Sequence, residues 1–398
     1  MTPDVVVIGA GPAGAAVSII LAQQGYRVLL LDRATFPRDK PCAEYLSPAC
    51  SPLLERLGVL QAVLAAVPQQ LQGMRITDYR GQSCVGHFVE NGQYLRGLAL
   101  PRRVLDHLLV QRACSVGVEL RTGFWVRQPL LVGKRVCGVS GSQNGKPMTV
   151  QAKLVIAADG LHSTLGRRLG VVQPVRWLQH IALVTHYAQV EARQPRGEMF
   201  LIPFGYIGLA PVTADLVNVS LVIRAQRLSQ AQIKPEMFLE QTIHAHPELR
   251  QRFAHAVRMQ RLLTTGPMAQ STTCPRHDGI LFVGDAAGFF DPFTGQGIYL
   301  ALHGAALAAA ATHQALCTGD TSAQNLRHYF LTHRQVFRDK YRVSKLIQLG
   351  LRCPWLATRV IKRLAHNPGL ADTVVGVTGD FLSPQAVLSW RFARRVLV

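Results

Sequence analysis

The sequence lacks the cysteine and histidine spacings that mark a zinc site or a redox disulfide. Its 398 residues include eight cysteines, but none forms a CxxC pair and none stands at zinc-ligand spacing from a histidine. We therefore expect no metal site, no secreted disulfide framework and a reducing, cytoplasmic setting. Acidic residues are also scarce, because 23 Asp and Glu stand against 43 Lys and Arg and give a formal net charge of +20.

Long hydrophobic runs are missing as well. The longest apolar stretch, residues 298–311, is interrupted by His303 and Gly304 and is shorter than the roughly 20 residues that cross a bilayer. The apolar N-terminus has no basic leader and carries Asp4, so we expect neither a signal peptide nor a transmembrane helix. The basic residues are dispersed and match no nucleic-acid module, so we expect no nucleic-acid partner.

The clearest positive signal is a glycine-rich turn between an apolar strand and an alanine-rich helix. In such a turn one glycine allows the bend, one admits a pyrophosphate and one lets the helix lie against the strand. The helix N-terminus offers free N–H groups to the anion, and a second strand ends at Asp32, where a carboxylate would meet ribose hydroxyls. The pattern predicts a bound dinucleotide held by Gly9, Gly11, Pro12, Ala13, Gly14, Asp32 and Arg33.

Further elements of the same kind follow along the chain. Prolines keep residues 36–48 from forming a regular helix, so we expect a shaped loop there. Arg102 opens an amphipathic helix that ends near Gly117. Two more apolar strands, 154–158 and 279–283, run into the polar pairs Asp159-Gly160 and Gly284-Asp285. We expect the parallel strands of one nucleotide-binding sheet to carry these motifs.

The middle of the chain has a different pattern. From about residue 173 to 275, apolar residues alternate in short runs, which predicts strands of a sheet with one covered face. A helix-prone stretch, 234–259, interrupts them, and the chain after residue 295 is mainly helical.

Three motifs together resemble the flavoprotein monooxygenase superfamily with the para-hydroxybenzoate hydroxylase fold. They are the N-terminal glycine turn, the Ala158-Asp159-Gly160 segment and the Gly284-Asp285 segment, and they bracket residues 4–300. The resemblance implies bound FAD, with Asp159 and Asp285 beside the cofactor and Asp285 on its ribityl chain. It also implies that Arg102 approaches the FAD phosphates.

Two details are similar to the geranylgeranyl reductase branch of that superfamily. One is the segment Asp291 to Gly297, and the other is a loop that places a cysteine beside the flavin, although Ala43 stands where glycine is usual. A helix that starts at Gly295 would direct the positive end of its dipole at the reduced flavin. The resemblance therefore adds these cofactor residues: Cys42, Ala43, Gly160, Gly284, Gly295, Gln296, Gly297 and Ile298. The Trp-x-Trp-x-Ile-Pro motif of flavin halogenases is absent, so we set halogenation aside.

The expected fold is α/β, with an FAD-binding Rossmann-like lobe of the glutathione-reductase type, a mixed substrate-binding sheet and a helical C-terminus. We expect the FAD-binding domain to be discontinuous and to comprise residues 1–70, 100–172 and 276–330. The substrate-binding domain would take residues 71–99 and 173–275, and the basic helical region residues 331–398.

Two reactions remain open. The first is an NAD(P)H-driven monooxygenase that hydroxylates a hydrophobic aromatic or polyketide-like molecule. The second is a reductase of isoprenoid or polyene double bonds, which needs an acid to supply a proton. The retained motifs disfavour a non-catalytic flavin- or lipid-binding protein. NAD(P)H would visit transiently, because no second glycine fingerprint is present.

The candidate catalytic residues lie in the cysteine-containing loop, and the candidate pocket residues follow the strands of the middle region. Each also has an interpretation as a packing residue. The catalytic candidates are Cys42, Glu44 and Tyr45, and the pocket candidates are Phe204, Tyr206, Phe290 and Pro292.

The last 65 residues contain twelve Lys and Arg against three Asp. Apolar residues are interleaved with them at helical spacing, so this region is either a surface for anionic membrane lipid or a solvated face over the flavin lobe. The lipid interpretation would suit a hydrophobic substrate. The sequence leaves the oligomeric state open.

Overall fold

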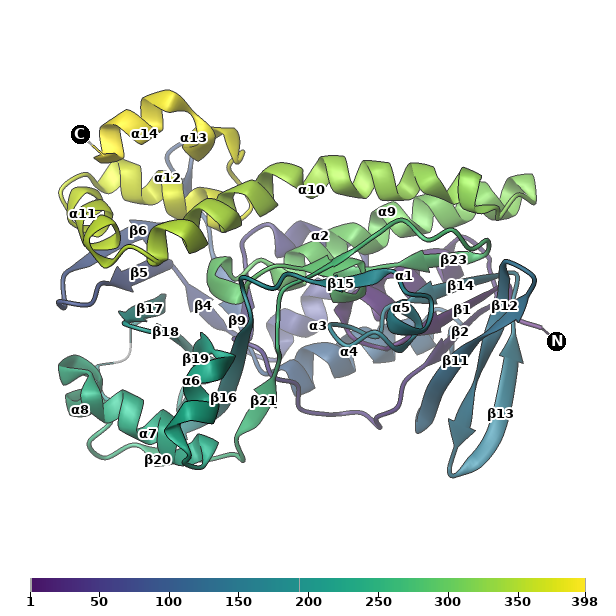
Figure 1. The fold of residues 1–398 in the computed structure, drawn as a ribbon, viewed down its shortest axis with the longest axis horizontal. Coiled ribbons are helices and arrows are strands. Elements are labelled where there is room, and N and C mark those ends of the chain that lie inside the picture. The colour runs from purple at the N-terminus through teal and green to yellow at the C-terminus, as the bar shows by residue number, and fades with distance from the viewer. Residues whose placement is uncertain (1, 193, 398) are drawn as a thin grey trace.

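A computed structural model describes residues 2–192 and 194–397 and contains two large sheets joined by helices (Figure 1). The first is a five-stranded parallel sheet with the strand order β10-β2-β1-β14-β23. Its strands are β1 (Val5–Ile8), β2 (Val28–Leu31), β10 (Glu119–Arg121), β14 (Leu154–Ala157) and β23 (Ile280–Phe282). The predicted nucleotide-binding sheet is therefore confirmed.

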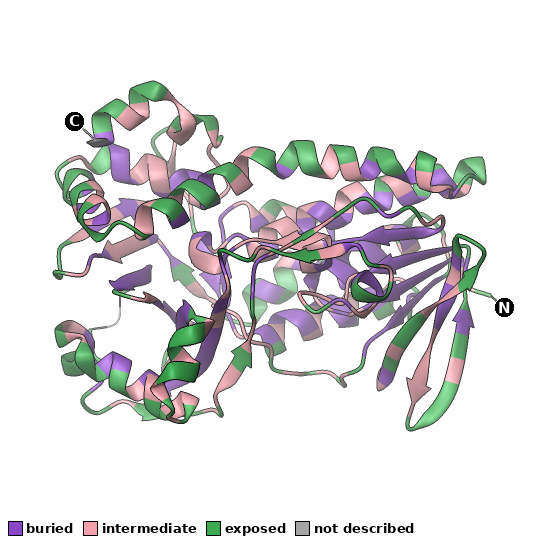
Figure 2. Cartoon of the chain, viewed as in Figure 1, coloured by how far each residue is buried: buried purple, intermediate pink, exposed green. Residues whose placement is uncertain are grey.

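The parallel sheet is covered on both faces, which explains why its central strands are apolar throughout. Three helices pack on one face, namely α1 (Pro12–Gln23), α4 (Arg102–Ser115) and α9 (Gly297–Thr318). A three-stranded sheet covers the other face, formed by β11 (Phe124–Val132), β12 (Arg135–Gln143) and β13 (Lys146–Gln151). Figure 2 shows the strands of the parallel sheet buried, whereas the three-stranded sheet is partly exposed.

The second sheet has eight strands and forms the other half of the molecule. Its order is β20-β16-β19-β18-β17-β5-β6, with β21 also pairing with β16. It is mixed, because β17 runs parallel to β5 while the other pairs are antiparallel. The strands are β5 (Gly73–Thr77), β6 (Ser83–His87), β16 (His180–Ala188), β17 (Gly197–Ile202), β18 (Gly205–Pro211), β19 (Leu216–Arg224), β20 (Val257–Arg258) and β21 (Leu263–Thr265).

One face of the mixed sheet packs against helices from its own region, and the other faces the C-terminal helices and the cysteine-containing loop. The prediction of one helix-prone stretch over residues 234–259 is wrong in its length. The structure has two helices, α7 (Pro235–Ala245) and α8 (Pro247–Arg252), followed by the strand β20. Pro247 disfavours helical geometry at His246, whose extended backbone ends one helix and whose side chain caps the next.

The C-terminal part is helical, as predicted. The long helix α10 (Ala323–Leu351) begins at Ser322, whose hydroxyl accepts a hydrogen bond from the Asn325 N–H at 3.2 Å. It runs along one side of the molecule from the parallel sheet to a group of shorter helices (Figure 1). These are α11 (Pro354–Ala365), α12 (Pro368–Thr378), α13 (Gln385–Leu388) and α14 (Trp390–Leu397).

Within the described residues, no helix has both the length and the apolar character needed to cross a membrane. The expected boundaries of the two domains stay a prediction.

Candidate cofactor and substrate site

The glycine turn after β1 brings three backbone segments into close contact. Gly9 has a φ of +95°, and a Cβ there would clash with the carbonyl oxygen of Ala158. A Cβ at Gly14 would clash with the carbonyl oxygen of Gly9. These two positions therefore need glycine for backbone packing, as the turn motif predicts.

Gly11 serves a different purpose, because the space beside it is open. A Cβ there would meet only the guanidinium groups of Arg38 and Arg102, at 3.8 and 3.9 Å. Gly11 is also the N-cap of α1, so the free N–H groups of that helix face the same space. Two guanidinium groups and a helix N-terminus together form an anion site that fits a pyrophosphate.

One carboxylate holds both arginines. Asp106 accepts hydrogen bonds from Arg102 Nε and Nη2 at 2.7 and 2.8 Å, and its Oδ2 lies 2.9 Å from Arg38 Nη1. A single negative charge between two guanidinium groups leaves this cluster net positive. The Lys40 amine lies close by, 3.8 Å from where a Cβ of Gly160 would stand. Burial lowers its pKa, as do the charges of Arg102 and Arg38, while Asp285 opposes that shift.

The predicted carboxylates line the same side of the sheet. Asp32 lies beyond the end of β2, where its two oxygens accept hydrogen bonds from the N–H groups of Ala10 and Ala34 at 2.7 and 2.8 Å. Asp159 Oδ2 accepts from the Thr164 N–H at 2.7 Å, but its buried Oδ1 has no partner among the described residues. Burial raises the pKa of Asp159. An orphaned buried oxygen at this edge of the sheet is what a bound polar cofactor would satisfy.

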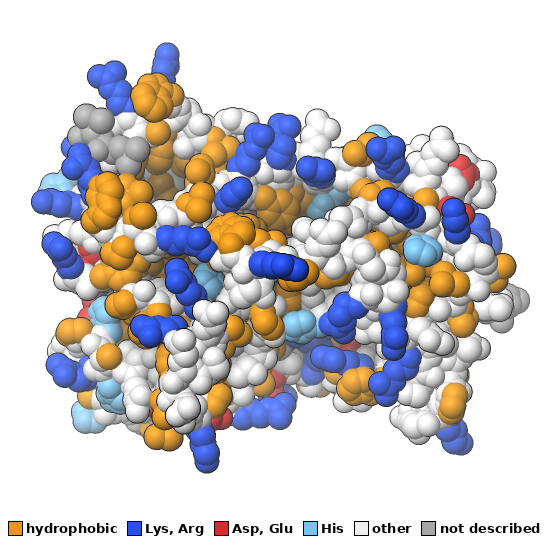
Figure 3. All heavy atoms as spheres, viewed as in Figure 1, with side chains coloured by type: hydrophobic (Ala, Val, Ile, Leu, Met, Phe, Trp, Pro, Cys, Tyr) orange, Lys and Arg blue, Asp and Glu red, His pale blue; other side chains and the backbone are white. Residues whose placement is uncertain are grey.

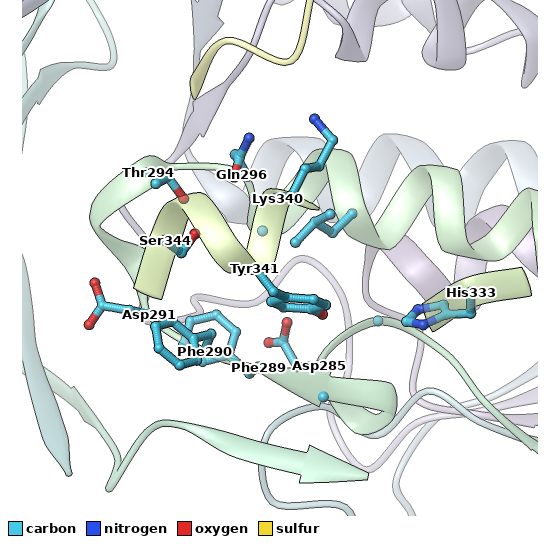
Figure 4. A pocket seen from close by; sticks show the side chains of 14 residues that line it. Asp285, Phe289, Phe290, Asp291, Thr294, Gln296, His333, Lys340, Tyr341 and Ser344 are labelled. Atoms are coloured by element: carbon cyan, nitrogen blue, oxygen red, sulfur yellow. The ribbon is translucent and has the colours of Figure 1, made fainter. Parts of the chain in front are cut away.

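Asp285 lies in the short turn Gly284–Ala287, and burial raises its pKa too. Figure 4 shows its carboxylate beside the ring of Tyr341, in a pocket between this turn and α10. Lys340 and Ser344 of α10 line the same pocket. The long helix therefore covers the residue that the resemblance assigns to the ribityl chain.

The residues at the start of α9 contact Tyr45 on one side and the C-terminal helices on the other. Gly295 has a φ of +69°, and the ring of Tyr45 lies so close that a Cβ there would stand 2.7 Å from its Cδ1. The Gln296 side chain points away to Asp380 Oδ1, to which it donates a hydrogen bond at 2.6 Å. Asp380 also binds Lys340 Nζ at 2.6 Å, and burial raises its pKa to about 6. At Gln296 only the backbone is thus left to serve a cofactor.

The residues present therefore fit FAD. The open space at Gly11, the surplus positive charge and the unpaired oxygen of Asp159 all lie along one edge of the parallel sheet. Sequence reasoning missed Arg38 and Lys40. The sequence offered one signal for them, namely two basic residues in the loop just before Cys42. Their proximity to Arg102 became visible only in the fold.

Glu44 is the centre of a buried hydrogen-bond network on the other side of that loop. Its Oε1 accepts from the Arg102 N–H at 2.8 Å, and its Oε2 lies 2.6 Å from His186 Nε2 and 3.1 Å from Asn218 Nδ2. The side chain is only 4% exposed. Its φ of +59° is unusual for a residue with a side chain, so the network holds the backbone in this conformation.

His186 carries the matching positive charge. Its two ring nitrogens face two acceptors, Glu44 Oε2 and Gln260 Oε1, the second at 2.8 Å. Only the imidazolium form donates through both nitrogens. Burial by itself lowers the pKa of His186, but the hydrogen bond and charge of Glu44 outweigh burial and raise it. The contact with Glu44 therefore favours the protonated form of His186.

Cys42 lies beside this pair and keeps its own proton. Burial raises the pKa of the thiol, and the charge of Arg102 partly opposes the rise. The sulfur accepts a hydrogen bond from the Glu44 N–H at 3.3 Å, and the Cys42 carbonyl accepts one from Asn218 at 2.9 Å. The structure thus brings Cys42 and Glu44 together. Tyr45 points the other way, with its ring against Phe88 and over Gly295.

A second buried network surrounds Asp291. Its Oδ2 lies 3.0 Å from His180 Nδ1, and its Oδ1 accepts hydrogen bonds from Tyr206 and Gln348 at 2.9 and 2.6 Å. The hydroxyl of Tyr206 stays protonated, because burial and the charge of Asp291 raise its pKa well above the usual value.

The two networks stand at opposite ends of one face of the mixed sheet. His186 and His180 lie on the same face of β16, since residues an even number apart share a face. Val184 and Ala182 stand between them, opposite Ser220 and Val222 of β19. The register places Tyr206 beside Val222. The apolar strip between the two networks is buried between the mixed sheet and the C-terminal helices.

The structure places the predicted pocket residues in different parts of the molecule. Phe204 packs against Phe238 and Arg227 in the helix-covered cluster, so we leave it out of the proposed pocket. Phe290 lies against Trp177 with ring centroids 5.7 Å apart. Pro292 begins the short turn after Asp291. Sequence reasoning missed His180, His186, Asn218 and Asp291, because nothing local in the chain indicates that strand residues will meet loop carboxylates.

The family comparison agrees with this geometry. A family model described as "FAD binding domain" matches residues 2–340. Digeranylgeranylglycerophospholipid reductase 1 of Methanopyrus kandleri is 32% identical over 351 residues, which cover 86% of this chain and 88% of the relative.

Solved structures share the fold over nearly the whole chain. The flavin-dependent brominase Bmp2 is 23% identical with a TM-score of 0.82, covering 95% of this chain and 94% of its own. A geranylgeranyl bacteriochlorophyll reductase-like protein of Thermoplasma acidophilum is 22% identical with a TM-score of 0.71, covering 97% and 95%. At these identities the two structures show the fold alone.

The expected α/β architecture and the expected FAD cofactor are confirmed by these findings. The glycine turn, the paired arginines and the sheet-edge carboxylates stand where a dinucleotide needs them, and the match extends over most of the chain. The chain belongs to the FAD-binding domain family and is an FAD-dependent oxidoreductase.

Proposed function

We propose that this protein reduces carbon–carbon double bonds in the isoprenoid chain of a lipid, the second of the two reactions that its sequence leaves open. The observation that carries the proposal is the buried thiol of Cys42 beside the Glu44–His186 pair, at the end of an apolar strip. Double-bond reduction adds a hydride to one carbon and a proton to the other, so it needs an acid in a dry site. The named substrate of the Methanopyrus relative is a lipid with such chains.

FAD supplies hydride-transfer chemistry when it is bound. Gly11, Arg38 and Arg102 would hold its pyrophosphate, and Asp32 its ribose. The side chains that face the sheet then orient the hydrocarbon and exclude water. The side chains of Val184, Ala182 and Val222 suit this task because they are apolar, and the neighbouring Ser220 hydroxyl donates its hydrogen bond to Asn218.

We assign the acid to Cys42. Its S–H bond breaks and a C–H bond forms at one carbon of the double bond, which leaves a thiolate. That thiolate would be stabilised by the N–H of Glu44 and by the charge of Arg102, the two groups that already oppose the raised pKa of the thiol. The thiol regains a proton from solvent before the next turnover. The Glu44–His186 pair positions the loop that carries it.

The assay is conversion of a geranylgeranyl-bearing glycerophospholipid by holoenzyme with dithionite as reductant and oxygen removed. The expected product has gained two hydrogens for each reduced bond, as read by mass spectrometry. Cys42→Ser should slow the reaction by about 100-fold or more without loss of FAD. Cys114→Ser, at an exposed position of α4, is the matched control and should leave the rate unchanged.

The opposite outcome would favour the first reaction, hydroxylation. Product that forms only with oxygen, and that has gained one oxygen atom, would contradict the reductase. NADH and NADPH should each replace dithionite in the same assay, since the natural electron donor stays a proposal.

Two further predictions stay proposals. One is the cytoplasmic location, which is supported by eight free cysteines in the structure. The other is peripheral contact with anionic membrane through residues 331–398. It is supported by the basic composition of that region and by the lipid substrate proposed above.

A further inference from the structure

The outer faces of α11 and α14 form a basic surface without acidic residues. The two helices together contain six Lys and Arg and no Asp or Glu. On α11 the basic residues and Trp355 are exposed, while Ile361 and Leu364 are buried on the opposite side. On α14 the three arginines stand at i, i+3 and i+4, which is one side of a helix. Each helix is thus amphipathic, with its charge facing out.

The two helices lie against each other, so their basic faces join. Arg363 Nε of α11 donates a hydrogen bond to the carbonyl oxygen of Arg395 in α14 at 3.1 Å. Below this contact, Ile361, Leu364 and Val396 are buried in a shared apolar cluster. Figure 3 shows Lys and Arg side chains beside exposed hydrophobic ones over this end of the molecule.

Four arginines line one surface groove between these helices: Arg363, Arg391, Arg394 and Arg395. Among residues 2–192 and 194–397, no carboxylate forms an ion pair with any of the four. Four like charges around one groove repel one another, and a bound anion relieves that repulsion. Arginine guanidinium groups match phosphate oxygens particularly well, because they can donate two parallel hydrogen bonds.

Exposed tryptophans flank the groove. Trp355 near the start of α11 is 70% exposed, and Trp390 at the start of α14 is 80% exposed. Leu349, near the end of α10, is 44% exposed. Tryptophan side chains favour the level of lipid headgroups, where one part of the ring is apolar and the other is hydrated. Charge and exposed apolar side chains on the same face distinguish this surface from one that only serves solubility.

We propose that the groove of Arg363, Arg391, Arg394 and Arg395 binds the phosphate of an anionic phospholipid, so that α11 and α14 lie on the bilayer surface with both tryptophans inserted among the headgroups. This inference rests on the membrane contact proposed above and assigns it to a defined phosphate site. The flanking tryptophans and leucine favour a bilayer over RNA or another hydrated polyanion.

The position of the groove also relates it to the substrate. The inner sides of α11 and α14 pack on the same apolar cluster that contains Val184, Val222 and Tyr206 of the mixed sheet. Docking through the groove would bring the bilayer to the side of the protein where this cluster lies.

The test is cosedimentation of the FAD-loaded protein with sucrose-filled vesicles of phosphatidylglycerol and phosphatidylcholine. We expect binding that rises with the phosphatidylglycerol content and falls with salt. The double variant Arg394→Gln/Arg395→Gln should lose about 25-fold in partitioning, at about fivefold for each arginine. Arg250→Gln/Arg261→Gln removes the same charge from exposed positions of the substrate side and should bind like the parent.

Each outcome decides the assignment. Equal loss in both double variants would overturn the groove and leave a general charge effect, and undiminished binding by the Arg394/Arg395 variant would overturn it as well. Trp355→Ala/Trp390→Ala should weaken binding too, and no change would contradict the docked orientation.

Two further arms separate the possible ligands. If free glycerol phosphate at millimolar concentration fully prevents vesicle binding, the groove is a site for free phosphate and not for a bilayer. If the protein binds polyuridylate and not vesicles, the groove is a site for RNA. No binding to any vesicle would refute the membrane contact itself. The reductase proposal is tested separately, because its assay can be run with lipid dispersed in detergent, where no bilayer is present.

Discussion

The cofactor side of this protein, at the parallel sheet, and the side proposed for the substrate, at the mixed sheet, handle charge in opposite ways. On the cofactor side, Arg38 and Arg102 share a single carboxylate, Asp106, beside the uncapped N-terminus of α1, and so leave positive charge unmatched. On the substrate side, the carboxylates of Glu44 and Asp291 are surrounded by donors and have little left to bind. The charge on the first side is neutralised only when a ligand binds, whereas the carboxylates on the second side already have their hydrogen-bond partners.

This difference indicates which variants should act through ligand binding and which through folding. Changes beside Gly11 should alter FAD affinity far more than the stability of the protein without FAD. Changes at Glu44 should alter stability whether or not FAD is bound. The predictions below use this contrast.

The largest effect is expected at Glu44. Glu44→Gln leaves His186 buried without its counter-charge, which should lower the free energy of unfolding by about 3 to 5 kcal/mol. Urea denaturation of apoprotein and holoprotein measures this, and the loss should be similar in both. Because the two residues share one interaction, Glu44→Gln/His186→Gln should cost less than the sum of the single variants. Additive losses would show that the pair is not coupled.

Gly11→Ala should show the reverse behaviour. The added methyl has room in the absence of FAD but occupies the space that the pyrophosphate needs. We expect FAD affinity to fall by roughly thirtyfold, or about 2 kcal/mol, with little change in apoprotein stability. Titration of apoprotein with FAD, followed by flavin fluorescence, measures this. Gly369→Ala, in open space on α12, is the control, and an equal loss of affinity there would contradict the assignment.

Tyr206→Phe tests the other end of the strip with a smaller change. It removes one of several hydrogen bonds to Asp291 and should cost about 1 kcal/mol of stability. The FAD content of the purified variant should stay that of the parent. Loss of flavin instead would show that the Asp291 network belongs to the cofactor side, and the contrast drawn above would fail there.

The smallest effect is a dependence of stability on pH. The pKa of His186 is raised on folding by its contact with Glu44. Its contribution is therefore complete below the unfolded pKa of about 6.5 and is lost as pH rises through the higher folded value. The stability difference between the parent and His186→Gln should shrink from pH 6 to pH 9, as measured by thermal unfolding. A difference that grows with pH would contradict the charged pair.

The same contrast explains what could be predicted from the sequence. The cofactor side follows from local patterns, because each glycine or aspartate directly follows an apolar strand whose end it must occupy in a parallel sheet. Asp32 was found in this way, whereas Asp159 and Asp285 follow two more such strands but owe their expected cofactor roles to the family resemblance. The loop cysteine came from a family resemblance, and its role as an acid stays a prediction.

The substrate side depends on contacts between distant residues. Glu44 and His186 are 142 residues apart, and Asp291 and His180 are 111 apart. A histidine within an apolar strand gives no sign of its partner, so neither pair could be identified before the strand register was known. Phe204 and Tyr206 illustrate the same point, since two aromatic residues of one short segment end in different clusters.

The central claim is that this protein adds hydrogen to a lipid double bond without oxygen. The most direct measurement is a single turnover, in which holoenzyme is reduced with one equivalent of dithionite under nitrogen and mixed with a geranylgeranyl-bearing glycerophospholipid. We predict that the flavin absorbance returns to the oxidised form while the lipid gains two hydrogens per enzyme. A flavin that stays reduced until oxygen is admitted, with lipid that then gains an oxygen atom, would contradict the account.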